Sequence, residues 1–294
     1  MIADQIVEQV AQQVADQPDF ITPHITDSHA LDYPCFHSGF VCEYELPRWD
    51  PIHIGRFALD ISPTRHVVML WIAALLCIFT TLLALRAHNR RMREGRAPSG
   101  LGNGLEGLVL YLRNEVILPS VGPHGNAYVP FLLTLFFFIL FANVLGLVPY
   151  GATATGNISV TATLAIITFI VIEIAGMKAQ GWGYINTIVF WPHDMSLGLK
   201  LPITFILTPI ELIGKFTKPF ALAIRLFANM VSGHVVLLAL ISLIFTFATW
   251  ILVPVPIALA LAISLLELFV AFLQAFIFTL LSSVFIGLIR EGAH

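Results

Sequence analysis

A single arginine stands near the start of a very long apolar stretch. Between residues 219 and 289 the only formally charged residues are Arg225 and Glu267. Asn229 and Ser232 follow the arginine at i+4 and i+7, so a helix places all three side chains on one face. An arginine at the centre of a bilayer costs roughly 2.5–3.5 kcal/mol and marks a candidate functional site. The alternative is an arginine that extends its charge to the membrane surface.

A histidine and a glutamate could handle protons in the same region. His234 follows Arg225 by nine positions, which is the opposite side of a helix at about 100° per residue. Glu267 and Gln274 are seven apart on the next helix and share a face. If these antiparallel helices tilt, His234 and Glu267 can meet as a proton-relay pair. The alternative is a structural hydrogen bond between the two helices.

A polar stripe precedes the arginine. Glu211, Lys215 and Lys218 are spaced i, i+4 and i+7. The stripe could line the mouth of an inner aqueous channel, or it could be a solvated helix end with an ordinary Glu–Lys pair. Glu173, in an earlier apolar stretch, lies close enough to Lys178 to be interfacial.

The elements that must position these residues are membrane helices. Stretches of about 20 apolar residues, enough to cross roughly 30 Å of hydrocarbon, occur at 66–85, 129–148 and 158–177. Residues 99–122 predict an amphipathic helix on the cytoplasmic surface, or else an ordinary connecting loop.

The last third of the chain predicts a helical hairpin. Two overlong helices, about 201–252 and 257–289, flank a turn at Pro254 and Pro256. At 1.5 Å per residue the first would reach about 75 Å. It must therefore be strongly tilted, broken at an internal proline, or partly outside the bilayer.

Composition and charge agree with a membrane-embedded protein. Of 294 residues, 57% are hydrophobic and 11% charged, with a mean hydropathy of +0.86. The net charge of −3 argues against nucleic acid as a partner. Residues 1–62 hold ten acids and two bases, whereas residues 86–96 hold five arginines and one glutamate. Because basic residues stay on the cytoplasmic side, we expect the N-terminus outside and the C-terminus in the cytoplasm.

The sequence lacks the motifs of several kinds of chemistry. The sequence contains no Walker A loop and no HExxH, so we expect no nucleotide chemistry, cofactor or metal on this chain. Two histidines in membrane stretches, His66 and His234, are too few for a bis-histidine haem across several helices. A secondary transporter would show inverted repeats, and none is evident. Cys35 and Cys42 could form a disulfide or remain two free thiols.

Four motifs together resemble subunit a of the rotary F-type ATP synthase. They are "NVLGLVPYGATATGNISVTATLA" at 143–165, "ITFILTPIELIGKFTKP" at 203–219, "KPFALAIRLFANMVSGH" at 218–234 and "LELFVAFLQAFIFTLL" at 266–281. The resemblance runs from about residue 62 to 290. It implies an all-α integral membrane protein with about five membrane helices, one amphipathic surface helix and a long tilted hairpin.

The resemblance assigns roles to particular residues. The family's essential arginine corresponds to Arg225, its helix neighbour to Asn229, the facing glutamine to Gln274 and the cytoplasmic acid to Glu211. In the best-known bacterial pattern an acid follows the arginine by nine and a histidine precedes the glutamine by seven. Here these positions hold His234 and Glu267, so the pair is exchanged. Supporting roles would fall to Ser232, Lys215, Lys218 and Glu173.

The resemblance also implies a mechanism and partners. A ring of c subunits would exchange protons with two offset half-channels, and Arg225 would separate them. Further partners would be b-type peripheral stalk subunits, the rest of the complex and membrane lipids, in a bacterial inner membrane or else an organelle inner membrane.

The expected division of the chain has five parts. These are an outside extension at 1–62, the first membrane helix and its basic flank at 63–97, the amphipathic segment at 98–124, two membrane helices and a loop at 125–200, and the hairpin facing the c-ring at 201–294.

Overall fold

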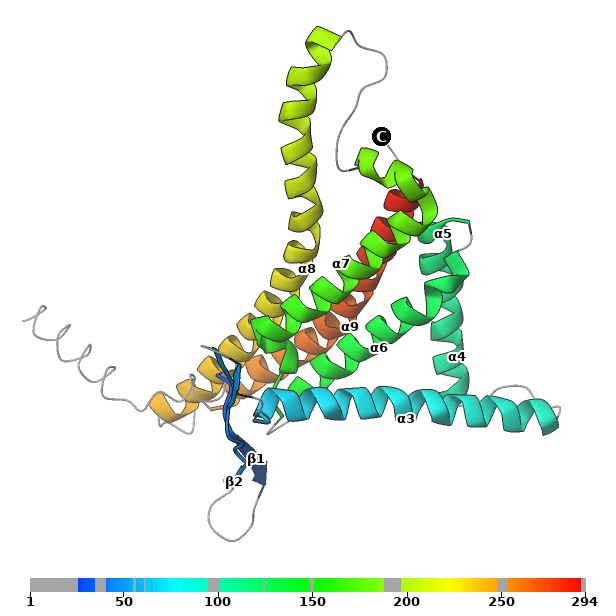
Figure 1. The fold of residues 1–294 in the computed structure, drawn as a ribbon. Helices are drawn as coiled ribbons and strands as arrows, with labels where there is room; N and C mark the ends of the chain where they lie inside the picture. Colours follow the sequence, from blue (N-terminus) through cyan, green and yellow to red (C-terminus); the bar gives the residue numbers. More distant parts are fainter. Residues whose placement is uncertain are drawn as a thin grey trace, which may run out of the picture.

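The computed structural model is a bundle of long helices with short strands beside the start of the first helix (Figure 1). It describes residues 26–34, 41–54, 57–60, 62–94, 101–123, 125–148, 151–187, 197–247 and 253–291. Within these ranges, five helices are long and apolar enough to cross a membrane. The predicted all-α membrane architecture is therefore confirmed.

Short antiparallel strands occur in the extension at residues 1–62, within the part of it that the structure describes. β1 (Ala30–Pro34) pairs with β2 (Val41–Glu45), and β3 (Ile52–Ile54) pairs with β4 (Phe57–Leu59). Val, Ile, Phe and Tyr in these segments favour extended backbone. Cys42 on β2 is disulfide-bonded, whereas Cys35 lies outside the described residues. Cys77, in the first membrane helix, is a free thiol.

The first membrane helix and the amphipathic segment form where they were expected. α3 (Arg65–Glu94) contains the predicted span at 66–85. Residues 101–121 of this segment are helical rather than a loop: α4 (Leu101–Tyr111) continues through a π-helical turn, η1 (Leu112–Ile117), into α5 (Leu118–Val121). Gly122 then ends the helix with a positive φ of 77°, which glycine adopts without strain.

The next two membrane helices are joined by a segment that packs inside the bundle. α6 (Val129–Gly146) carries Pro130 in its first turn, where a proline costs no helical hydrogen bond. η3 (Ala154–Gly156) follows and leads into α7 (Ile158–Gln180). The Asn157 side chain accepts a 2.9 Å hydrogen bond from the Ser159 amide and caps α7. η4 (Gly181–Thr187) comes next.

The last two helices are the longest. α8 (Leu197–Phe247) runs for 51 residues through three internal prolines, and α9 (Pro254–Glu291) runs for 38. Figure 1 shows the first half of α8 curving away from the other helices and its second half lying beside α9. Each internal proline removes one backbone hydrogen bond and favours such a bend. α8 is therefore one continuous helix, and the prolines do not break it.

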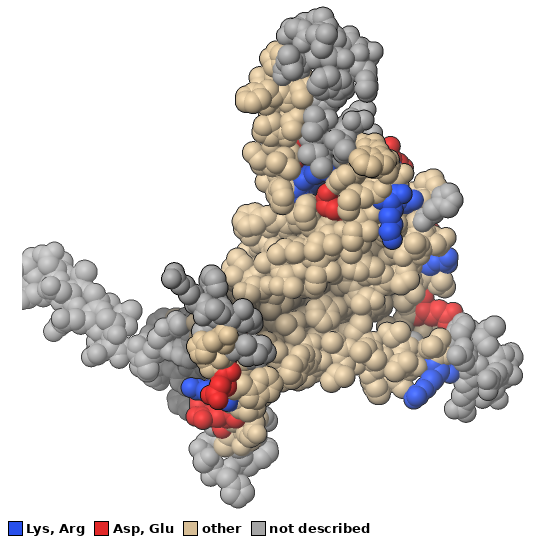
Figure 2. All heavy atoms as spheres, in the orientation of Figure 1, with Lys and Arg blue, Asp and Glu red and all other residues tan. Residues whose placement is uncertain are grey.

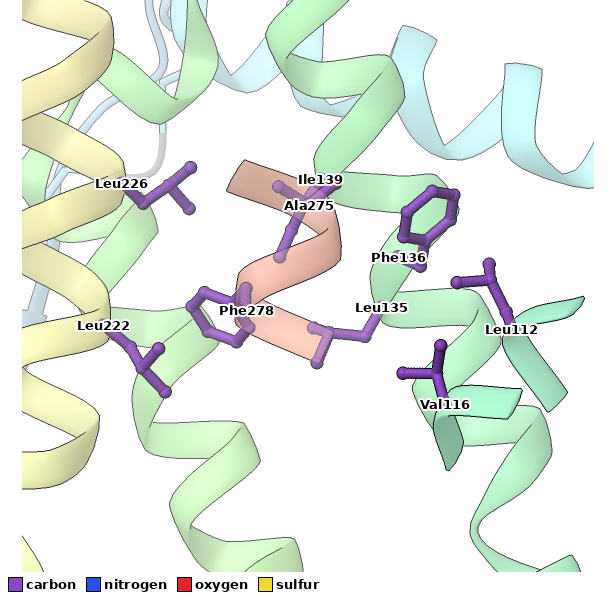
Figure 3. Packing of buried hydrophobic residues seen from close by; sticks show 9 residues of the cluster. All are labelled: Leu112, Val116, Leu135, Phe136, Ile139, Leu222, Leu226, Ala275 and Phe278. Atoms are coloured by element: carbon purple, nitrogen blue, oxygen red, sulfur yellow. The ribbon is translucent and has the colours of Figure 1, made fainter. Parts of the chain in front are cut away.

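An apolar layer joins four elements at the middle of the bundle. Leu222 and Leu226 of α8 face Ala275 and Phe278 of α9, and these pack on α6 and η1 (Figure 3). The contributions of α6 and η1 are Leu135, Phe136, Ile139, Leu112 and Val116. Figure 2 shows the middle of the molecule as a broad uncharged body with Lys, Arg, Asp and Glu at its margins. This distribution fits a bilayer around the helices.

Candidate functional site

The two ends of the bundle carry different segments of the chain. At the extension end, the Arg65 amide donates to Ser28 O, and Asn157 Nδ2 donates to Asp27 Oδ2 at 3.4 Å. At the C-terminal end, Arg290 donates to the carbonyls of Val121 and Pro123 at 2.9 and 2.7 Å. α6 and α8 run toward the extension end, and α7 and α9 run away from it.

His234 points toward the segment between α6 and α7. Its Nε2 forms a short contact with Thr153 Oγ1. Thr153 is buried because Gly146 leaves room for it: a Cβ on Gly146 would lie 2.7 Å from the Thr153 Cβ. Residues 149–157 contain no Lys or Arg, which predicts a loop on the outside. The described part of this loop folds into the bundle and supplies a partner for the histidine.

Asn143 anchors the same segment from the side of α6. The side chain is fully buried, its Oδ1 accepts a 2.7 Å hydrogen bond from Thr155 Oγ1, and its Nδ2 donates to Ala271 O at 3.4 Å. A buried amide requires such partners. Asn143 and Thr155 therefore tie η3 to α6 and α9.

Glu267 lies directly against the backbone of α8. A Cβ added to Gly233 would meet the Glu267 carboxylate, with 2.8 Å to its Cδ. Glu267 Oε2 is buried and makes no hydrogen bond with any described residue. Glu267 thus reaches the immediate neighbour of His234, and the direct His234–Glu267 pair stays a prediction.

Asn229 and Gln274 join the two helices one turn from the arginine. Asn229 Nδ2 donates to Gln274 Oε1 at 3.0 Å, and Gln274 is 1% exposed. Gln274 Nε2 is buried without a hydrogen-bond partner among the described residues. The glutamine expected to face Arg225 is therefore bonded to Asn229.

Arg225 lies on the exposed face of α8. Among the residues that the structure describes, none forms a hydrogen bond or ion pair with its guanidinium group. Ser232, two turns further, is exposed on the same side and bonds only its own helix, at Asn229 O. The arginine therefore faces out of the bundle, away from His234.

The polar stripe of α8, Glu211, Lys215 and Lys218, does not form one continuous contact, because Lys215 turns toward the neighbouring helix α7. Lys215 Nζ lies 3.6 Å from Glu173 Oε2 on α7 and donates a 3.0 Å hydrogen bond to the Tyr184 hydroxyl in η4. Of the two alternatives for this stripe, the described contacts do not show the Glu211–Lys215 pair, since Lys215 turns toward α7. Glu173 pairs across helices rather than with Lys178. Lys218 is exposed and its Nζ lies 5.5 Å from the Phe285 ring centroid.

Sequence reasoning missed four residues that contact the candidate site or anchor its segments: Asn143, Thr153, Thr155 and Tyr184. All are uncharged, and their roles come from contacts between distant segments, which spacing along the chain does not reveal. Within the described ranges, no group of three His, Cys, Asp or Glu could hold a metal ion.

The fold and these contacts define a polytopic helical membrane protein with polar groups buried near both ends of its bundle. The family model for the ATP synthase A chain matches residues 67–287. This chain belongs to that family.

Relatives agree over most of the chain. It is 48% identical over 265 residues to ATP synthase subunit a of Chloroherpeton thalassium, covering 90% of this chain and 74% of the relative. It is 43% identical over 288 residues to ATP synthase subunit a 2 of Chlorobaculum tepidum, covering 97% and 77%. ATP synthase subunit a of Anaeromyxobacter dehalogenans is 44% identical over 278 residues, covering 92% and 69%.

Proposed function

We propose that this chain is the proton-conducting stator subunit in the membrane sector of ATP synthase. It supplies two offset half-channels, which couple proton flow to rotation of a c-subunit ring and to ATP synthesis. Nucleotide chemistry takes place on other subunits. Family membership and the relatives' names support the general role, and the side-chain arrangement supports the finer one.

The outer half-channel uses the polar side chains nearest the extension end. His234 and Glu267 take protons from outside, and Asn229 and Gln274 line the path along which they reach the ring. The buried, unbonded oxygen of Glu267 could accept a hydrogen bond from water or bind a transferred proton, and the buried, unbonded nitrogen of Gln274 could donate to water.

The observation that carries the proposal is the apolar layer between the two polar ends. Leu222, Leu226 and Phe278 are each at most 2% exposed, and they separate Asn229 and Gln274 from the polar side chains at the C-terminal end. A proton cannot cross such a layer without polar partners. It must instead leave the chain at the outer exposed face and return at the inner one, carried by another subunit.

Arg225 stands on that face between the two polar ends. Its charge is permanent, whereas a lysine in an apolar setting can lose its proton. A ring carboxylate that arrives protonated is therefore drawn into its ionised form beside Arg225. The same charge repels a proton that would leak directly across. Glu211 then marks the inner half-channel, and Lys218, Lys215 and Glu173 support it by positioning charge rather than by carrying protons. Ser232, which bonds Asn229 O, supports the outer half-channel.

The proposed partners follow from the exposed surfaces. The apolar face of α8 and α9 beside Arg225, including Ile224, Leu265 and Phe269, would meet the c-ring. Other apolar faces would meet b-type peripheral stalk subunits and lipid. We place the chain in a bacterial inner membrane, with the extension outside and the C-terminal end in the cytoplasm, and keep the five-part division stated above.

The test is the Arg225→Ala variant in membrane vesicles, with assembly of the complex measured first. We expect ATP synthesis and ATP-driven proton pumping to vanish while passive proton leak rises. Arg225→Lys gives a second variant of similar charge and is expected to be severely impaired. Lys178→Ala removes an exposed cation at the end of α7 and should have little effect. Coupled pumping near the wild-type rate in assembled Arg225→Ala complexes would overturn the proposal.

A further inference from the structure

An ion pair joins α7 and α8 near the C-terminal end of the bundle. It affects which nearby carboxylate can exchange protons. Lys215 Nζ lies 3.6 Å from Glu173 Oε2, donates a 3.0 Å hydrogen bond to the Tyr184 hydroxyl, and lies 4.5 Å from the centroid of the Tyr184 ring. Its side chain is 9% exposed and that of Glu173 is 20% exposed. Lys215 is therefore held by α7 and η4 together.

Glycine makes this arrangement possible. Tyr184 is 8% exposed and lies against α7 at Gly176, where an added Cβ would be 2.8 Å from the tyrosine Cε2. The phenol thereby sits in front of Lys215 as both a hydrogen-bond acceptor and an aromatic face. A lysine in an apolar span requires such partners.

The alternative partner for Lys215 is on its own helix. Glu211 precedes it by four residues, which is the favoured orientation for a Glu–Lys pair on a helix surface. Yet Glu211 makes no hydrogen bond or ion pair with any residue in the part of the chain that the structure describes. The contacts to Glu173 and Tyr184 thus outcompete the local pair and leave the Glu211 carboxylate open.

We propose that Glu173 is a positioning residue, which keeps Lys215 away from Glu211 so that Glu211 can exchange protons at the inner half-channel. The inference rests on the proposed function, in which Glu211 marks that half-channel. Without the Glu173 charge, Lys215 turns to Glu211, and the resulting ion pair disfavours protonation of the carboxylate.

The experiment measures ATP-driven proton pumping per assembled complex in membrane vesicles. Glu173→Gln keeps the shape of the side chain and removes its charge, and we expect it to slow pumping roughly five- to tenfold. The double variant Glu173→Gln/Lys215→Met removes the competing cation and should return the rate to within about twofold of wild type. The matched control, Glu173→Gln/Lys178→Met, removes a cation on α7 instead of Lys215 on α8, and it should not restore the pumping rate.

A second measurement separates this role from a structural one. If Glu173 acts through Glu211, then Glu173→Gln/Glu211→Gln is no slower than Glu211→Gln alone, whereas a purely structural loss multiplies the two defects. Three results would overturn this inference alone. The first is a slow Glu211→Gln together with a normal Glu173→Gln. The others are failure of Lys215→Met to rescue Glu173→Gln, and defects that multiply in the Glu173→Gln/Glu211→Gln variant. A normal rate for Glu211→Gln overturns the inner half-channel assignment as well.

Discussion

At the scale of single residues, Gly233 determines how closely a carboxylate approaches α8. Because a Cβ at this position would meet the Glu267 carboxylate, Gly233→Ala must displace Glu267 or push α9 away from α8. We expect pumping per assembled complex to fall about tenfold or more, since a displacement of about 1 Å in a positioned group costs that much or more in rate.

The same helix offers a matched control. Nothing lies within 4 Å of a Cβ built on Gly214, so Gly214→Ala should leave the rate unchanged and stabilise α8 slightly. If Gly233→Ala pumps as fast as Gly214→Ala, then contact between Glu267 and α8 is not required for proton transfer.

Residue-scale features could be predicted only where charge made them conspicuous. Arg225 and Glu267 stand out because nothing else in their stretch is charged. The Asn229–Gln274 bond was not predicted, because the family resemblance placed Gln274 opposite Arg225. The partners of His234 and Lys215 lie 81 and 31 residues away in sequence, so only packing could reveal them.

At the scale of elements, α9 and α5 approach each other through a glycine. A Cβ on Gly287 would meet the carbonyl oxygen of Ser120, with 3.1 Å to the carbonyl carbon. Backbone cannot rotate away as a side chain can, so Gly287→Ala should separate the two elements. Overpacking of this kind typically costs about 1–3 kcal/mol.

Thermal aggregation of the subunit in membranes measures this cost. We expect Gly287→Ala to aggregate at a lower temperature than wild type, and Gly107→Ala on α4, whose Cβ would meet nothing within 4 Å, to match or exceed wild type. Equal aggregation temperatures for the two variants would mean that α5 does not depend on this close approach.

Helix positions followed from hydropathy, and the connections did not. The span predicted at 158–177 is α7, Ile158–Gln180, because a bilayer requires a minimum apolar length. The segment before it lacks Lys and Arg, which predicts an outside loop but does not reveal that Thr153 and Thr155 are buried. A small polar residue such as threonine is compatible with a buried or an exposed position, so its packing partners determine which position it takes.

At the scale of the whole molecule, an ion pair fastens the extension to the membrane helices. His66 Nδ1 lies 2.7 Å from Asp27 Oδ1 at the start of α3. Partial burial acts to raise the pKa of Asp27, but the hydrogen bond and charge of His66 outweigh it and lower the pKa from 3.8 to about 2. The stability that the Asp27 carboxylate contributes to this attachment is therefore fully present from about pH 4 and is lost as the pH falls toward 2.

Pepsin digestion from outside tests this attachment. We expect residues 26–34 to stay protected at about pH 4–5 and to be cut progressively faster below that range, whereas Asp27→Asn should be cut readily throughout. Asp50→Asn removes an exposed carboxylate and should keep the wild-type pH profile. An Asp27→Asn profile identical to wild type would show that the extension is held by other contacts.

The outward position of Arg225 has a consequence for biogenesis. Newly inserted chain carries a permanent charge on an apolar surface, and no described residue neutralises it. Its free energy in the bilayer therefore falls when a partner supplies a carboxylate, which makes the unassembled subunit the less stable species. We expect cells that lack such a partner to accumulate little of this chain, because an orphan subunit with this surface is a substrate for membrane proteases.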